Sequence, residues 1–334
     1  MTHKIKIFKH LFFLIAIIAL AAIQSGCMKE DYSDCPKNGV IKVKVFFTKH
    51  NDGNIDLFEK EVTKVDMFFF DKKGTLVSHI IDTNGPFVNG YTKEVKLIEG
   101  EYNVVVWANL FEDTKIEGIN VDEICYDKAR LNVVTEEINK NLVVRNLPTT
   151  LFHSEVAFTV RNGGEILVDA PLTLDTKNIN ISVNFQKRDG TTCPKEEHTE
   201  PLKTFIKAQN GQYRFDNSLT NLNWITYLEH NALPWTGSIE KEPLYRCTFR
   251  THRLIVGAKD LLTINIHHND NTENPIYERS LVALIQLLSQ YASQDALDRE
   301  RTFNIDINIT CETHMVGSIY INGWLVVEYG EDVH

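Results

Sequence analysis

The stretch Asn178-Ile179-Asn180-Ile181-Ser182-Val183-Asn184-Phe185 alternates polar and apolar residues without a break. A second stretch, Phe303-Asn304-Ile305-Asp306-Ile307-Asn308-Ile309-Thr310, repeats the pattern. Successive side chains of a strand point to opposite faces of a sheet, so a period of two predicts strands with one buried and one hydrated face. These two stretches favour a β-rich fold.

The rest of the chain follows the same pattern. Strand-like runs occur at 41–47, 65–70, 102–107 and 156–160, and eight Asn-Gly or Asp-Gly pairs lie along the chain. Such pairs tolerate the backbone of tight turns, so short strands with this punctuation predict antiparallel sandwiches. Helix is scarce, with one helix expected over Ser280–Tyr291 and a short turn over 295–301. Asn146-Leu147-Pro148-Thr149-Thr150 is the best candidate for a linker between two β-rich parts.

Composition and charge exclude several classes of protein. The 334 residues are 43% apolar and 24% charged, which is typical of a globular chain and not of a disordered one. The length predicts two domains. The formal charge of -10 argues against nucleic acid as a partner, because phosphate contacts need clustered Lys and Arg.

The N-terminus has the features of a lipoprotein signal peptide. Three lysines in the first nine residues precede an apolar run, Leu11–Ile23, that is too short to span a membrane. Gln24-Ser25-Gly26-Cys27 follows and resembles a bacterial lipobox, in which the cysteine is acylated. We expect residues 1–26 to be removed and Cys27 to carry lipid (palmitate). The alternatives are an uncleaved anchor or an ordinary secretory signal.

The residues directly after Cys27 form a short tether, 27–39. Within it Lys29, Glu30 and Asp31 resemble the surface-export signal of Bacteroidia lipoproteins. The alternative is a hydrated linker. These features together predict an outer-membrane protein that is exposed at the cell surface and held there by its lipid.

The sequence gives little support for an enzyme, a metal site or a cofactor other than the covalent lipid. It contains no G-x-S-x-G, H-E-x-x-H, P-loop or G-x-G-x-x-G motif. The adjacent His267 and His268 would point to opposite faces of a strand, and the Asp298-Arg299-Glu300 run favours local charge contacts at a helix end over an acid–base site. Six cysteines include no C-x-x-C pair, and lipid on Cys27 would leave an odd number whose pairing stays open.

One binding alternative remains from the aromatic residues. Trp224, Tyr227 and Trp235 lie close in sequence and could form a platform for stacking sugars. Such residues are more often buried in a core or a loop. An exposed aromatic row would favour a surface glycan-binding lipoprotein.

Several short motifs in order resemble the FimB/Mfa-type fimbrial subunits of Bacteroidia. The motifs are Tyr32-Ser33-Asp34-Cys35-Pro36, Phe69-Phe70-Asp71-Lys72-Lys73-Gly74, Gly100–Ala108, Leu151-Phe152-His153-Ser154, Thr176–Asn180, Leu297-Asp298-Arg299-Glu300 and Ile321-Asn322-Gly323-Trp324. The resemblance implies an all-β fold of two tandem transthyretin-like sandwiches, placed by the linker at 40–148 and 151–330. It implies a lipid-anchored subunit that holds a type V fimbria on the outer membrane and binds its stalk subunits. A tip or accessory adhesin is the alternative role within the family.

The resemblance also implies assembly by strand donation, in which an extended segment of one subunit completes a sheet of another. Ser318–Tyr329 is the candidate donor or edge segment, with Ile319 and Ile321 on one face and Leu325 and Val327 on one face after them. Asn322-Gly323 within it is either a two-residue hairpin turn or a bulge in one long strand.

Stalk subunits of this class are activated by an Arg-specific protease that cuts near the N-terminus. Between Cys27 and the linker, the only arginines are Arg130 and Arg145, and neither follows a first strand closely. We therefore expect no activating cleavage in the first domain, as an anchor requires.

Overall fold

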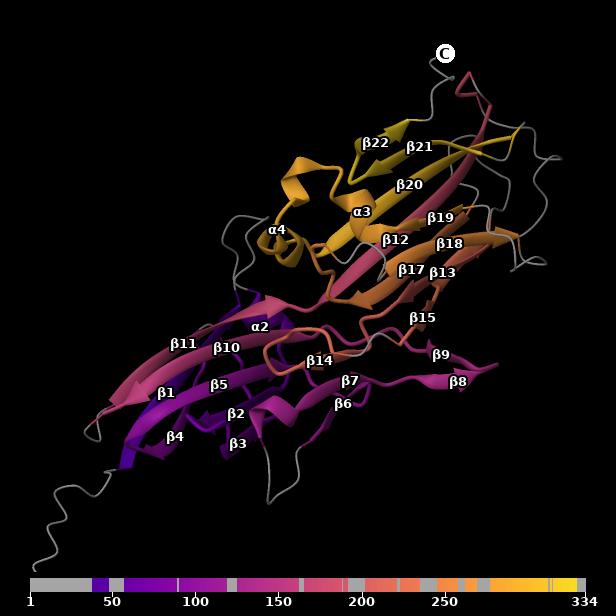
Figure 1. The fold of residues 1–334 in the computed structure, drawn as a ribbon. Helices are drawn as coiled ribbons and strands as arrows, with labels where there is room; N and C mark the ends of the chain where they lie inside the picture. Colours follow the sequence, from indigo (N-terminus) through magenta and orange to yellow (C-terminus); the bar gives the residue numbers. More distant parts are fainter. Residues whose placement is uncertain are drawn as a thin grey trace, which may run out of the picture. The chain divides into compact units, whose positions relative to one another are not determined.

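The computed structural model describes residues 38–47, 57–88, 90–118, 125–161, 165–187, 189–191, 202–220, 223–234, 245–257, 262–268, 277–311, 313 and 315–328. All of these belong to one unit of the chain, Asn38–His334. Strands dominate it and the few helices are short, so the all-β expectation is confirmed (Figure 1).

The first sheet has seven strands in the order β3-β2-β5-β10-β11-β1-β4. Within this sheet, strands β10 and β11 are joined by only two residue pairs, Phe152 with Leu174 and His153 with Thr173. The sheet therefore bends there, and apolar residues from its strands share one core, to which the edge strand β3 adds the partly buried Ile80. The strands are β1 (Asn38–Phe47), β2 (Val65–Asp71), β3 (Leu76–Asp82), β4 (Thr92–Ile98), β5 (Gly100–Ala108), β10 (Phe152–Val160) and β11 (Glu165–Leu174).

A three-stranded sheet, β14-β7-β6, covers the outer face of β2 and β5. Because β2 and β5 are covered on both faces, their sequences are almost continuously apolar rather than alternating. Trp107 is fully buried in this second core and lies 4.5 Å from the ring of His153. The three strands are β6 (Thr114–Glu117), β7 (Arg130–Val133) and β14 (Gln212–Arg214).

Two six-stranded sheets form the second sandwich, in the orders β16-β17-β12-β20-β21-β22 and β19-β18-β13-β15-β9-β8. The two alternating stretches 178–185 and 303–310 lie in β12 (Thr176–Gln186) and β20 (Thr302–Thr310), which pair in parallel at the centre of one sheet. Their alternation is confirmed, since Ile179, Ile181 and Val183 are buried. The other strands are β8 (Glu136–Ile138), β9 (Asn141–Val144), β13 (Leu202–Ala208), β15 (Ile225–Leu228), β16 (His230–Pro234), β17 (Tyr245–His252), β18 (Leu262–His268), β19 (Tyr277–Ser280), β21 (Val316–Ile321) and β22 (Trp324–Glu328).

The division between the sandwiches differs from the expected boundary at 148–151. Strands β10 and β11 follow the linker in sequence yet complete the first sheet, where β10 pairs with β5 over nine residues. Strand β9 precedes the linker yet pairs in parallel with β15 of the second sandwich. Hydrogen bonding between strands distant in sequence overrides the local Asn-Leu-Pro signal. Only Asp175 separates the first sheet from the second.

Helices are α2 (Phe58–Glu61), α3 (Leu281–Ile285) and α4 (Gln294–Arg299), with 3₁₀ turns η2 (Tyr126–Lys128) and η4 (Ser289–Tyr291). The helix expected over Ser280–Tyr291 is therefore shorter, because the chain turns extended at Leu288. Its cap is regular, with the Ser280 hydroxyl accepting the Ala283 N–H. Among the described residues, no helix has the length and apolar character needed to cross a membrane.

Candidate functional site

The C-terminal hairpin resolves the two readings of Asn322-Gly323. Strands β21 and β22 pair antiparallel, with Ile321 opposite Trp324 across a two-residue turn. Asn322 and Gly323 both have positive φ, at 50° and 82°, as this hairpin turn requires. The segment is thus a hairpin and not one long strand.

The four candidate residues of this segment lie in different environments. Ile319 and Ile321 are fully buried in the core of the second sandwich. Val327 packs partly against that core, whereas Leu325 is 46% exposed. The expectation that Leu325 and Val327 share a face is wrong, because a register shift opposite Ile319 and Tyr320 places an extra residue between them.

Strand β22 is the edge of its sheet. In a hairpin with a two-residue turn, the two residues that flank the turn, here Ile321 and Trp324, exchange both backbone hydrogen bonds. The next pair, Tyr320 and Leu325, does not, so the backbone N–H of Leu325 points away from β21. Trp324, 60% exposed, and Leu325 add apolar surface beside this backbone. An edge of this kind can accept a further strand.

The hairpin turn is fixed to the sheet by the Asn322 side chain. Its Oδ1 accepts the backbone N–H of Asn304 at 2.8 Å, and its Nδ2 donates to the Tyr291 hydroxyl at 3.0 Å. The Tyr291 hydroxyl in turn donates to Oε2 of Glu300 at 2.9 Å. The position of β22 is therefore tied to β20 and to the end of α4.

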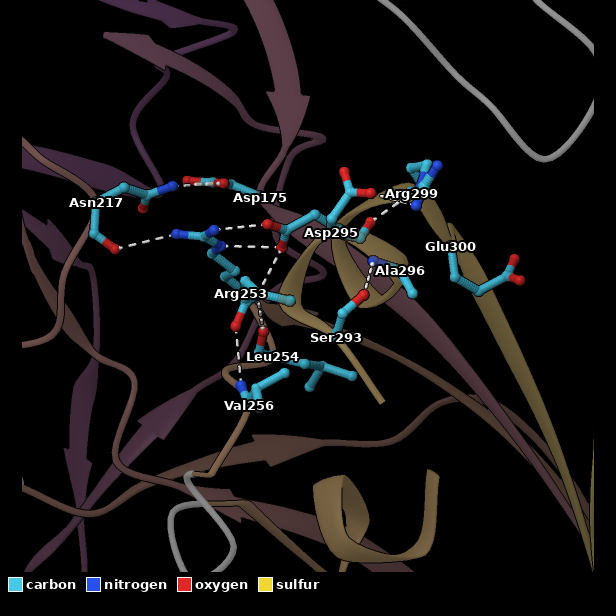
Figure 2. A network of polar contacts seen from close by, with 12 residues as sticks. Asp175, Asn217, Arg253, Leu254, Val256, Ser293, Asp295, Ala296, Arg299 and Glu300 are labelled. Atoms are coloured by element: carbon cyan, nitrogen blue, oxygen red, sulfur yellow. Dashed lines mark hydrogen bonds and ion pairs between the residues drawn. The ribbon is translucent and has the colours of Figure 1, made fainter. Parts of the chain in front are cut away.

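A second polar cluster lies where the chain passes from the first sheet to the second (Figure 2). The guanidinium of Arg253 donates to both carboxylate oxygens of Asp298, from Nε at 3.0 Å and Nη2 at 2.6 Å. Its Nη1 donates to the carbonyl of Asn217 at 3.3 Å, and Asn217 Nδ2 donates to Asp175 Oδ1 at 2.8 Å. This chain of contacts joins the loop after β14, the end of β17, the crossover residue and α4.

Lys177 is the least expected member of the cluster, because it is a fully buried lysine. Its ammonium donates to the carbonyls of Asp298 and Glu300, at 2.7 and 2.9 Å. Carbonyls at a helix C-terminus lack partners within the helix, and Lys177 supplies them for α4. Burial lowers the pKa of Lys177 to about 8 and raises the pKa of Asp175 to about 6.

The sequence predicts local charge contacts at a helix end for Asp298-Arg299-Glu300. The short contact is there, between Arg299 and Asp295, but Asp298 also binds Arg253, 45 residues away in sequence. The motifs Thr176–Asn180 and Leu297-Asp298-Arg299-Glu300 each contain a member of this cluster. The sequence does not indicate that these two segments lie side by side. Arg253 and Asn217 lie in no motif, so sequence gave no signal for them.

The alternative sites find limited support in the structure. Trp224 is 47% exposed, but Tyr227 is buried and its hydroxyl binds Asn210, so these two do not form a row. Trp235 lies outside the described residues.

No group of three or more potential metal ligands gathers within the described ranges. Cys125 and Cys247 are free thiols, and Cys311 is disulfide-bonded.

The expected lipidation and export residues, Cys27, Lys29, Glu30 and Asp31, lie outside the described residues and remain predictions.

Comparisons with known proteins give consistent matches along the chain. Residues 32–330 match the model of the family described as fimbrillin-A associated anchor proteins Mfa1 and Mfa2. The minor fimbrium anchoring subunit Mfa2 of Porphyromonas gingivalis is 24% identical over 332 residues, covering 95% of this chain and 94% of that one.

Solved structures show the same fold. The fimbrial anchor protein Mfa2 from Porphyromonas gingivalis superposes with a TM-score of 0.70 at 21% identity, covering 88% of this chain and 100% of the other. A Bacteroides thetaiotaomicron protein whose suggested role is polysaccharide binding gives 0.72 at 20% identity, covering 88% and 99%.

Proposed function

The chain belongs to the family of fimbrillin-A associated anchor proteins Mfa1 and Mfa2, and from this premise we propose that it is the lipid-anchored subunit that holds a fimbria to the outer membrane. Its membership makes it a fimbrial subunit of the cell surface that associates with other fimbrial subunits. The observation that carries the anchor role is the family match that begins at residue 32, directly behind the lipobox cysteine Cys27.

The lipid supplies the attachment. Acyl chains on Cys27 contribute roughly 0.8 kcal/mol for each buried CH₂ group, so more than one chain gives a stable hold on the bilayer. The tether expected over 27–39, whose last two residues are already part of β1, then joins the membrane to the fold, and Lys29, Glu30 and Asp31 direct the protein to the outer surface. No other cofactor enters this role.

The fimbrial partner joins at the edge of β22. A strand of a stalk subunit would pair with the outward backbone of Leu325 and cover the exposed Trp324. Because Ile319 and Ile321 are already part of the core, β21 is not available for donation, and the hairpin supports an acceptor edge better than a donated tail. Burial of a few apolar side chains contributes about 1.5–3 kcal/mol each, enough for a durable joint.

The arginine positions agree with an uncut N-terminal half. Arg130 begins β7 and donates to the carbonyl of Ala129, and Arg145 pairs with Glu136 after β9. Neither arginine lies in the loop after the first strand β1, which supports an anchor over a stalk subunit.

The test is made in the bacterium that produces the protein. Fimbrial protein is measured on cells and in the medium for wild type, a deletion strain and a Cys27→Ala strain. We expect filaments to form in both mutants and to be shed into the medium. Filaments that stay attached in the deletion strain would contradict the anchor role and favour a tip or accessory adhesin.

A further inference from the structure

We infer that the buried contacts around the Asp175 crossover lock the two sandwiches into one body that unfolds in a single step. Only Asp175 lies between β11 of the first sheet and β12 of the second (Figure 1). A connection of one residue has no slack, and the chain also passes between the sandwiches from β9 to β10 and on both sides of β14. The inference is independent of the proposed function.

The backbone of the crossover is held from the first sheet. The Asp175 N–H donates to the Leu151 carbonyl at 2.8 Å, and the Leu151 N–H donates to the Thr176 hydroxyl at 3.3 Å. On the far side, the Asn178 N–H donates to the Arg301 carbonyl at 2.9 Å. Rotation about Asp175 would break the two hydrogen bonds to Leu151.

Side chains cross the junction at three further places. Arg301 pairs with Glu61 of α2, which is 240 residues away in sequence, and Arg250 donates to the Pro148 carbonyl at 2.9 Å. At the third place Arg253 donates to the Asn217 carbonyl at 3.3 Å, and Asn217 in turn donates to Asp175 at 2.8 Å (Figure 2). These contacts involve α2, the 146–150 segment and the loop after β14, so the junction is held by several separate parts of the chain.

The Arg253–Asp298 pair lies within the second sandwich and holds the Arg253 guanidinium where it reaches the Asn217 carbonyl. Its side chains are only 18% and 10% exposed, and Gln294 Nε2 donates a third hydrogen bond to the same carboxylate at 2.8 Å. Removing one partner of a buried pair leaves an uncompensated charge, which costs far more than losing a surface pair. Lys177 also helps to hold Asp298 in place, because its ammonium donates to the backbone carbonyl of Asp298.

The same helix offers a matched control. Arg299 pairs with Asp295 one turn earlier in α4, and the Asp295 side chain is 71% exposed. Substituting Arg299 removes one positive charge and the ion pair with Asp295. Substituting Arg253 likewise removes one positive charge and the ion pair with Asp298. The Arg299 substitution leaves every contact across the junction in place.

The experiment compares full-length wild type with Arg253→Gln, Asp298→Asn and the control Arg299→Gln. Calorimetry counts the unfolding transitions, and hydrogen exchange follows the amides of residues 172–180. Wild type and Arg299→Gln should unfold in one transition. Arg253→Gln and Asp298→Asn should each show two transitions, with exchange at 172–180 faster by roughly a hundredfold or more and that of β5 unchanged.

Asp298→Asn keeps the shape and hydrogen-bonding oxygen of the side chain, so it carries the test if Arg253→Gln does not fold. The inference is wrong if wild type already unfolds in two transitions. It is equally wrong if both junction variants show one transition and the exchange rates of Arg299→Gln.

Discussion

The side-chain oxygen of Asn322, at the tip of the C-terminal hairpin, accepts the backbone N–H of Asn304 at the start of the neighbouring strand, 2.8 Å away. The same residue has a φ of 50°, so its backbone makes the turn while its side chain holds the turn against β20. Its amide nitrogen also donates to the Tyr291 hydroxyl. Two separate properties of one asparagine therefore position the edge strand β22.

Two substitutions separate these properties. Asn322→Gly keeps a backbone that accepts positive φ and loses only the side-chain bonds, so we expect a loss of about 1–2 kcal/mol in the free energy of unfolding. Asn322→Ala loses the bonds and also strains the turn, which should cost roughly 1 kcal/mol more. Urea unfolding of both variants measures the difference. Equal stabilities would show that the turn geometry is not under strain.

Much of the second sandwich could be predicted from its sequence. The alternation in 178–185 and 303–310 identified β12 and β20, and Asn322-Gly323 indicated the hairpin. These signals are local, because a strand face or a turn depends on neighbouring residues. The edge position of β22 is not local, since it follows from which strands pair.

The junction could not be predicted for the same reason. A lysine before an alternating strand reads as a hydrated side chain, yet Lys177 is buried because the carbonyls of Asp298 and Glu300, more than 120 residues away, need donors. The linker signal at 146–150 was real as an interruption of strands, but β10 and β11 return to the first sheet after it. Long-range pairing decided both outcomes.

Substituting the backbone of β22 tests the proposed acceptor edge. Leu325→Pro removes the N–H that points away from β21, and it should spare the β21–β22 hydrogen bonds. We expect binding to stalk subunits to fall at least roughly tenfold, while stability changes little. Leu325→Ala is the matched control, since it trims the side chain and keeps the N–H. Affinity is measured between the purified protein and stalk subunits.

The two Leu325 variants have different consequences for the proposal. If both bind stalk subunits as wild type does, the partner joins elsewhere on the molecule. If both lose binding equally, the side chain and not the backbone carries the contact, and strand addition at this edge is excluded.

Acid should destabilise the protein through its buried histidines. Burial lowers the pKa of His252 to about 4, and neither ring nitrogen has a hydrogen-bond partner among the described residues. Between pH 6.5 and 4 the unfolded chain binds a proton that folded His252 does not, so stability falls as pH falls through this window. At about 1.4 kcal/mol per pH unit, His252 contributes a loss of order 3 kcal/mol by pH 4. His153, whose pKa burial also lowers to about 4, acts in the same direction.

Asp175 acts in the opposite direction. Burial raises its pKa to about 6, so the folded protein binds this proton first and Asp175 adds stability as pH falls from 6 toward 4. The difference in the free energy of unfolding between wild type and His252→Phe cancels the contribution of Asp175 and of every other group that the two proteins share. That difference should shift by about 3 kcal/mol between pH 7 and pH 4, in favour of the variant at low pH. Parallel stability curves would show that folded His252 binds its proton as readily as the unfolded chain does.

The N-terminal signals make the last prediction, because lipidation and surface export are separable steps. Cys27→Ser removes the sulfur to which acyl chains are attached, so the protein should no longer partition into the detergent phase with the lipoproteins. Replacing Lys29, Glu30 and Asp31 with alanine keeps Cys27, so this variant should partition as wild type does. The triple alanine variant should resist protease added to intact cells, since it would remain on the inner side of the outer membrane. Digestion of this variant at the wild-type rate would show that the three residues are a hydrated linker and that another part of the chain directs export.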